Sequence, residues 1–408
     1  MRNVLMALVV LVAATVIRAE PTLIQNSDQP VHGVQRVQLE EQWRIGGADD
    51  EDNFFGLVTW AETDDDGLLY VLDFQLCHVN VYDRQGTLVK TLFREGEGPG
   101  EVRQPRDLVL LEDGSVGVVQ EFPGKIITVD RDGNPGDTIT PGTGDPTTGG
   151  FLALTSASNR GGSFTVAGVT IKPQDQPGTR ARTMFLTTID SDGIVGPSLM
   201  EKFTTWDFNN FVYDEVETLP SFWFANAVGP DGRIYAAAQR DAYRINVYTP
   251  DGTLEKVIER QYTSWHRTGA EMDWFRTLFE GAFSSLPFEM TLKLAEKASD
   301  INWLNRGLQV DEGGSLWVLP SRGTREQPEG VMVTFDVFDA AGSFDHQVQF
   351  VCPDGDGTRD SLFLLDDERV LLIKGYLDAS AMMLGGAVEE NEGEEAEPME
   401  LVCYRRVE

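Results

Sequence analysis

One pattern recurs six times along the chain, and this repeat constrains the fold more than any other feature of the sequence. Each copy has an acidic or glycine turn, a short apolar strand, a loop, a second strand that usually ends in Asp, and a hairpin turn. A single hairpin cannot bury both of its apolar faces, so neighbouring copies must pack against one another. The copies begin at Asp64, Glu112, Gly161, Pro230, Glu312 and Asp366.

The spacing of the copies predicts the architecture. The turn glycines Gly67, Gly114 and Gly162 are 47 and 48 residues apart, which fits the roughly 40 to 50 residues of a four-stranded propeller blade. Six copies therefore predict an all-β fold, a six-bladed β-propeller closed into one ring, with a single domain over residues 20–408. The strand-like segment 34–47 has no hairpin of its own, and we expect it to pair with the last blade and close the ring.

Two segments depart from the repeat. Residues 260–306 predict a helical insertion before the fifth blade, and residues 385–400 predict an acidic, disordered loop, because seven glutamates there repel one another. Capture of a cation or partner by these glutamates is the alternative. Two short helices are expected in the insertion from the spacing of its apolar residues, which are Met272, Phe275, Leu278, Phe279, Met290, Leu292 and Leu294.

The N-terminus is typical of a secretory signal peptide. Arg2 precedes an apolar run from Val4 to Ile17, and the small residue Ala19 follows. We expect cleavage near Ala19, export to the periplasm or medium, and no membrane span afterwards. An uncleaved anchor is the alternative, because Arg18 makes the cleavage site imperfect.

A glycine-rich stretch carries a family resemblance. The sequence REGEGPGEVRQPRDLVLLEDGSVGVV, residues 94–119, resembles the NHL-repeat propellers, and more closely the exported bacterial proteins described as six-bladed β-propellers. Gly96, Gly98 and Gly100 match the turn of that pattern, and Pro105 matches its proline. The resemblance implies a propeller fold but no single activity, because related propellers serve as binding scaffolds, lyases and hydrolases.

Charge excludes one class of partner. Asp and Glu number 66 against 33 Lys and Arg, so the formal charge is -33. Nucleic-acid affinity depends on neutralising phosphates with basic side chains. We therefore expect no nucleic-acid partner.

Motifs of catalysis are missing from the sequence. The four histidines have no zinc-ligand spacing, no G-x-S-x-G elbow is present, and Pro99 within the glycine-rich stretch excludes a dinucleotide loop. The glycines of that stretch are instead interpreted as a connection between blades.

A calcium loop is one hypothesis for the C-terminal quarter. Asp354, Asp356 and Asp360 place oxygens at alternating positions, as calcium loops do, so Ca²⁺ is a candidate cofactor. The loop has Arg359 where calcium loops have glycine, and a cluster of Asp/Gly turns is the alternative.

Arginines concentrate on one predicted face. Loops between second and third strands and connections between blades open on the same face of a propeller, where ligands usually bind. Guanidinium groups match carboxylates, so the hypothesis is an anionic small molecule, acidic peptide or glycan as ligand. Ion pairs with neighbouring acids are the alternative. The candidate ligand-binding residues are Arg103, Arg106, Arg240, Arg306 and Arg322, with Arg94, Arg325 and Arg359 on the same face.

The three cysteines, Cys77, Cys352 and Cys403, are no disulfide framework. A bridge between Cys352 and Cys403 and three buried free thiols remain alternatives.

These observations favour an exported, monomeric binding module for a small molecule, glycan or protein. The alternative is a lactonase or lyase whose divalent metal is held by scattered oxygens in the channel, which needs no linear motif. A structural interaction protein of the cell envelope is a third possibility.

Overall fold

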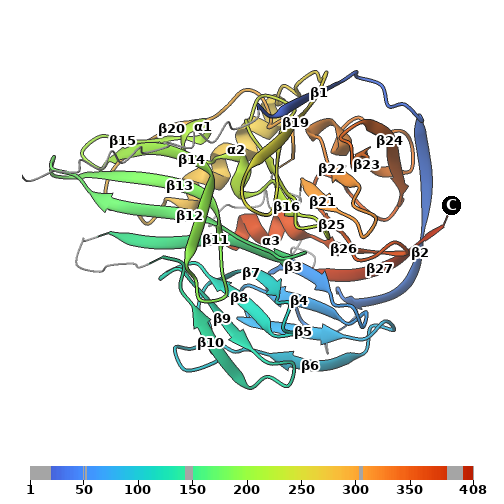
Figure 1. Cartoon of the computed structure of the whole chain (residues 1–408), viewed down its shortest axis with the longest axis horizontal. Helices are drawn as coiled ribbons and strands as arrows, with labels where there is room; N and C mark the ends of the chain where they lie inside the picture. Colours follow the sequence, from blue (N-terminus) through green and yellow to red (C-terminus); the bar gives the residue numbers. More distant parts are fainter. Residues whose placement is uncertain are drawn as a thin grey trace, which may run out of the picture.

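The computed structural model of the chain consists almost entirely of β-sheet. It describes residues 20–48, 50, 53–142, 150–302, 307–383 and 398–407. Figure 1 shows the sheets arranged around a common centre, as in a β-propeller. The predicted all-β, propeller-like architecture is therefore confirmed. The signal segment 1–19 and residues 385–397 of the acidic segment lie outside the described residues.

Four sheets of four or five strands form separate units within the described residues. The first contains β3 (Val58–Thr63), β4 (Leu69–Asp73), β5 (His78–Tyr82) and β6 (Leu88–Leu92). The second contains β7 (Pro105–Leu110), β8 (Val116–Gln120), β9 (Lys125–Val129) and β10 (Pro135–Ile139). The third contains β11 (Phe151–Arg160), β12 (Ser163–Pro173), β13 (Thr179–Ile189) and β14 (Val195–Asp207). The fourth contains β16 (Asn226–Val228), β17 (Ile234–Ala237), β18 (Arg244–Tyr248), β19 (Leu254–Arg260) and β1 (Thr22–Asn26).

The remaining large sheet has eight strands, because β2 joins two four-stranded groups. β2 pairs in parallel with β24 and antiparallel with β27, so the expected pairing of segment 34–47 with the last repeat is confirmed. The parallel pairing of β1 with β19 was not predicted, since residues 22–26 precede the first copy of the repeat. The strands of the large sheet, in sheet order, are β21 (Leu308–Val310), β22 (Leu316–Val318), β23 (Val331–Phe338), β24 (Phe344–Val351), β2 (Val34–Gly46), β27 (Glu400–Val407), β26 (Arg369–Lys374) and β25 (Ser361–Leu364).

The insertion between β19 and β21 contains one of its two expected helices. Helix α2 (Gly269–Ala282) is capped at its N-terminus by Thr268, whose hydroxyl accepts from Glu271 N while the Glu271 carboxylate accepts from Thr268 N. The prediction of a second helix is wrong, because Met290–Lys293 forms strand β20, which pairs in parallel with β15 (Phe211–Asp214). Met290, Leu292 and Leu294 alternate with polar residues, and a period of two indicates a strand. The other short elements are α1 (Glu215–Thr218), α3 (Tyr376–Met383) and the 3₁₀ turns η2 (Ser221–Trp223) and η3 (Ser321–Thr324).

The recurrent Asp of the repeat has a structural role in the turns. Asp64 Oδ1 accepts hydrogen bonds from Asp66 N at 3.1 Å and Leu68 N at 2.9 Å. Such side-chain bonds to the backbone two and four residues later stabilise a turn. The same pair of bonds recurs at Asp83, Asp130 and Asp190. These four aspartates therefore stabilise the turns of the repeat.

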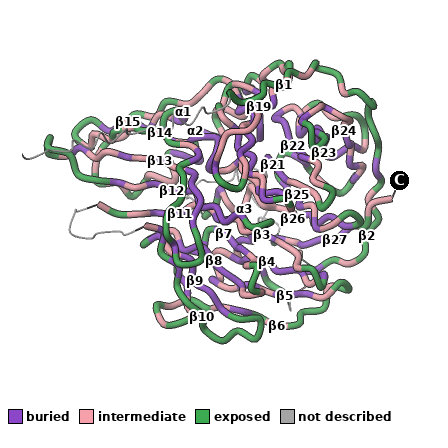
Figure 2. Tube along the Cα trace, in the orientation of Figure 1, coloured by how far each residue is buried: buried purple, intermediate pink, exposed green. Residues whose placement is uncertain are grey.

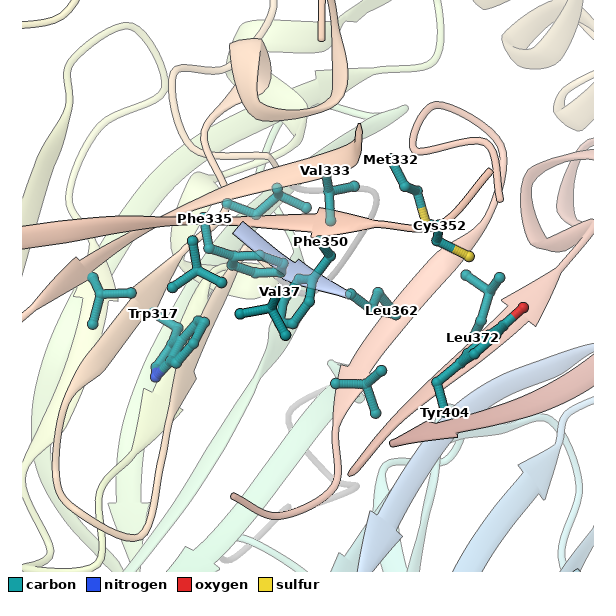
Figure 3. Close-up of a cluster of buried hydrophobic side chains, with 14 of the residues drawn as sticks. Val37, Trp317, Met332, Val333, Phe335, Phe350, Cys352, Leu362, Leu372 and Tyr404 are labelled. Atoms are coloured by element: carbon teal, nitrogen blue, oxygen red, sulfur yellow. The ribbon is translucent and has the colours of Figure 1, made fainter. Parts of the chain in front are cut away.

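The hydrophobic core lies between neighbouring sheets. Figure 2 shows buried residues concentrated in the inner and middle strands, while outer strands such as β6 and β10 are largely exposed. In the cluster of Figure 3, Trp317 packs against Phe335 with ring centroids 6.0 Å apart, and Val37 reaches the same cluster from β2. Strand β2 therefore contributes to a core built mainly from the last quarter of the chain.

The glycine-rich stretch is a connection between β6 and β7, as expected. Gly100 has a φ of +73°, in the region that favours glycine. A Cβ on Gly96 would lie 2.0 Å from the Glu101 carboxylate, and that carboxylate accepts a hydrogen bond from Gly98 N at 2.8 Å.

Candidate functional site

A cavity of about 920 Å³ occupies the centre of the ring. The innermost strands β3, β7, β11, β16 and β21 contact one another in this order around the centre, and Figure 1 shows α3 close to it. Ligand pockets in proteins typically measure roughly 300–1,000 Å³. Every innermost strand contributes lining residues, and these strands are β3, β7, β11, β16, β21 and β25.

The cavity has two chemically different ends. Each innermost strand is followed by a hairpin turn, and these turns form one end, here the turn mouth. The opposite end, the loop mouth, is formed by the starts of the innermost strands and the loops between second and third strands. Acidic residues line the turn mouth, and they are Asp64, Asp65, Glu112, Asp311, Glu312, Asp366 and Asp367.

Several turn-mouth acids bind main-chain amides or arginines. Glu112 Oε1 accepts from Gly162 N at 2.7 Å, which joins the turns of neighbouring sheets. Glu312 pairs with Arg160 at 2.5 Å, and the same guanidinium donates to Val310 O at 2.7 Å. Arg160 therefore crosses from β11 to β21 and fixes the wall of the turn mouth.

Polar side chains inside the cavity link adjacent innermost strands. Buried Asp107 on β7 accepts from Ala157 N of β11 at 3.0 Å. Gln309 Oε1 on β21 accepts from Leu364 N of β25 at 3.0 Å. Thr63 donates to Leu365 O at 2.6 Å. These bonds stabilise the ring where the short inner strands leave backbone groups unpaired.

Three further hydroxyl groups in the cavity wall form no such bonds between strands. The side-chain oxygens of Thr59, Thr155 and Ser156 are buried and have no hydrogen-bond partner among the described residues, although all three residues line the cavity. A buried hydroxyl without a partner is unfavourable. The wall therefore offers unused hydrogen-bonding groups next to the cavity.

The loop mouth is aromatic and is built by the insertions. Tyr213 of β15 lies 5.0 Å from Phe279 of α2 and 4.8 Å from Phe283, measured between ring centroids. These three side chains line the cavity together with Phe224 and with Tyr376 of α3. The inserted segments thus give the loop mouth an aromatic lining.

A buried ion-pair cluster holds the insertion in place. The Arg267 guanidinium binds both oxygens of Glu215 at 2.7 Å, and both side chains are 1 % exposed. Arg240 donates to the same carboxylate at 3.1 Å, and Ala295 N donates to it at 3.0 Å. Burial raises the pKa of Glu215, but the hydrogen bond and charge of Arg267 outweigh this effect and lower the pKa overall.

Arg103 and Arg106 lie at the start of β7, near the loop mouth, and each is paired with a carboxylate. Arg103 binds Glu97 at 2.6 Å, and Arg106 binds Glu121 at 2.5 Å. Arg106 lines the cavity and lies 5.0 Å from the ring centroid of Phe74.

The other predicted arginines are not brought to the same place. Arg240 is buried in the Glu215 cluster, and Arg322 donates to Thr263 O at 2.7 Å and lies 5.3 Å from the Trp265 ring centroid. Arg306 lies outside the described residues. Carboxylate partners, as the alternative interpretation expects, are also present for Arg94 with Glu101, Arg325 with Glu271 and Arg359 with Asp378. The anion-binding role of these arginines stays a prediction.

The carboxylates of Asp354 and Asp360, two of the three candidate calcium ligands, are engaged by other groups of the protein. Asp354 binds Arg44 at 2.7 Å, and this hydrogen bond is the main cause of its lowered pKa. Asp360 accepts from Asp356 N at 2.8 Å and Gly375 N at 2.9 Å, while burial raises its pKa. Across the described ranges, no group of three or more His, Cys, Asp or Glu side chains is arranged to hold a metal ion. The calcium role of Asp354, Asp356 and Asp360 stays a prediction.

The three cysteines are buried free thiols, as one of the two alternatives expected. Burial raises the pKa of each thiol. No helix in the described part of the chain has the length and apolar character needed to span a membrane.

Sequence reasoning missed the residues that converge at the turn mouth. In the sequence, the acidic turns at 64–66 and 112–114 are simply part of the repeat, and no ligand-binding role is predicted for them. A signal was present, since acids recur between the first and second strands of several copies, and this position lies at one end of a propeller channel.

Comparisons with known proteins give structural similarities at low sequence identity only. No protein-family model matches the chain, and the curated proteins include no match. Among solved structures, a Bacteroides fragilis protein thought to be exported has a TM-score of 0.47 at 11 % identity, over 95 % of this chain and 100 % of that chain. A DUF4221-family member from Bacteroides vulgatus has a TM-score of 0.45 at 12 % identity, over 91 % and 98 %. The calcium-binding protein regucalcin from Agrobacterium tumefaciens has a TM-score of 0.42 at 11 % identity, over 91 % and 96 %.

Proposed function

We propose that this protein is an exported, six-bladed β-propeller that binds a small molecule in its central cavity. The six-blade count is supported by dividing the eight-stranded sheet at the parallel β2–β24 pair. Each half then has four strands and begins with an innermost strand, β21 or β25, that lines the cavity. Export rests on the signal-like segment 1–19, and the intact mass of the mature protein tests it.

The cavity carries the proposal of binding. Its volume of about 920 Å³ suits a small molecule, and its wall combines aromatic side chains with unused hydroxyls. Its backbone is held by cross-strand bonds from Asp107 and Gln309, so the site is largely preformed. A preformed site loses little free energy to ordering when a ligand binds.

A cavity-filling variant tests this function. Ser158 on β11 lines the cavity, whereas Ser191 lies in the exposed turn between β13 and β14. We expect Ser158→Trp to abolish binding of ligands found in a thermal-shift screen of small metabolites, and Ser191→Trp to preserve it. Ala227→Phe, also in the lining, replaces Ser158→Trp if that variant fails to fold. Equal binding by the lining and control variants would exclude the cavity as the site.

The metal-dependent lactonase or lyase predicted as the alternative has its own test. Divalent metal retained through purification, together with metal-dependent hydrolysis of a lactone, would favour the enzyme. Ligand binding that persists after chelation, without turnover, would favour the binding module.

A further inference from the structure

The charge of the cavity lining is strongly unbalanced. Ten carboxylate residues line the cavity against four arginines, a net of six negative charges. A concave surface of one sign between low-dielectric walls concentrates its field and attracts ligands of the opposite sign. The sign is opposite to that needed for the anionic ligand predicted from the arginines.

The four arginines of the lining are already engaged. Arg106 pairs with Glu121, Arg160 with Glu312, and Arg131 with Asp66 at 2.7 Å. The guanidinium of Arg406 lies 5.2 Å from the ring centroid of Trp317. An anion would therefore have to compete with existing carboxylate or ring contacts.

Two acids of the turn mouth remain available. Asp65 and Asp367 are exposed in their hairpin turns, line the cavity, and have no side-chain hydrogen bond or ion pair among the described residues. They come from neighbouring repeats of the ring, the first and the last. A positively charged group at this mouth would bind either carboxylate without breaking an ion pair of that carboxylate.

The interior suits an apolar body attached to that charge. Trp60 and Phe363 line the cavity with their rings edge to face and centroids 6.0 Å apart. Tyr213, Phe279 and Phe283 line it toward the loop mouth. Aromatic faces attract organic cations as well as apolar groups.

We infer that the cavity binds a small organic cation, an amine with an apolar body, whose ammonium lies at the turn mouth near Asp65 and Asp367. This inference rests on the proposed ligand-binding function of the cavity. The volume, the aromatic wall and the excess of carboxylates all belong to the same cavity and favour the same chemical class of ligand.

Three probes with one fluorophore test the charge preference. Dansylcadaverine carries a primary ammonium, dansylamide is neutral, and dansylglycine carries a carboxylate. With the purified protein at low ionic strength, we expect dansylcadaverine to bind at least about tenfold more tightly than dansylglycine, and added salt to reduce the difference because it screens charges at the open mouth. Equal or tighter binding of dansylglycine would overturn the inference.

Two double variants that each lose two negative charges test whether the preference for the cationic probe arises at the turn mouth. The double substitution Asp65→Asn and Asp367→Asn is expected to reduce the preference for dansylcadaverine at least about threefold. Asp175→Asn with Asp192→Asn removes two charges from exposed loops whose residues do not line the cavity, and is expected to leave this preference unchanged. Equal effects of the two pairs would overturn the assignment to the turn mouth.

The failure of this inference is distinguishable from failure of the proposed function. If Ser158→Trp abolishes binding of all three probes but the wild type shows no charge preference, the cavity binds ligands and the cation inference is wrong. If Ser158→Trp changes the binding of no probe, the cavity is not the binding site and both proposals are wrong.

Discussion

The two mouths of the cavity differ in origin as well as in chemistry. The turn mouth is made by the repeat itself, and its acids lie in short hairpin turns held by local bonds such as those of Asp64. The loop mouth is covered by segments that interrupt the repeat, and the long-range ion pair between Glu215 and Arg267 joins two of these segments. The repeat thus supplies charge at one end, and the insertion supplies an apolar cover at the other.

Among the proposed substitutions, removal of Arg267 should have the largest effect on stability, because it breaks the ion pair behind the loop mouth. Arg267→Met leaves Glu215 buried with one arginine partner fewer, and losing one member of a buried pair typically costs about 3–5 kcal/mol. We expect a loss of about 3 kcal/mol in the free energy of unfolding, measured by urea denaturation.

The control for Arg267 is Arg103→Met. The Arg103–Glu97 pair is exposed, so its loss should change stability by at most about 1 kcal/mol. Equal losses in the two variants would show that the Glu215 cluster does not anchor the insertion.

The pH dependence of stability tests the contribution of the Glu215 carboxylate. The pKa of Glu215 is lower in the folded protein than the unperturbed value of 4.5. Its ionised form therefore stabilises the fold above that value, and the stabilisation is lost as the pH falls through the lower folded pKa. We expect the melting temperature of the wild type to fall more steeply with acid, below about pH 4.5, than that of Glu215→Gln.

In the same acid titration, Glu97→Gln serves as the exposed control and should follow the wild type. Parallel curves for the wild type and Glu215→Gln would contradict a role for this carboxylate in acid stability.

The smallest effect is expected from substituting the two predicted anion-binding arginines near the loop mouth, with anion binding as the measured quantity. Arg103 and Arg106 are both paired with carboxylates, so Arg103→Gln with Arg106→Gln should change dansylglycine binding by no more than about twofold. Fluorescence titration measures this change. A loss of tenfold or more would instead establish the anion site predicted from the sequence and would reverse the contrast between the two mouths.

Local patterns were sufficient to predict the repeat, the turns and the closing strand. Asp-Gly turns and short apolar runs act over a few residues, so the hairpins and the pairing of segment 34–47 with the last repeat could be expected. The strand β20 was missed because apolar residues in a short segment fit a period of two as well as a helical period.

The partners of individual charged side chains could not be predicted. Glu215 and Arg267 are 52 residues apart in the chain, and neither position carries a motif. Arg240 belongs to the same face of the repeat as Arg106, yet the insertion buries it against Glu215 while Arg106 remains in the cavity wall. Such pairs depend on how separate loops pack, which no local pattern encodes.

By itself, therefore, the sequence determined an all-β repeat fold with acidic turns, because turn geometry and strand burial depend on near neighbours in the chain. Only the tertiary structure decided that these turns from distant repeats meet at one mouth of a cavity, and that inserted aromatic side chains cover the other. Ring closure brings residues such as Asp65 and Asp367 to the same opening, and the charge of that opening is a property of the assembled ring.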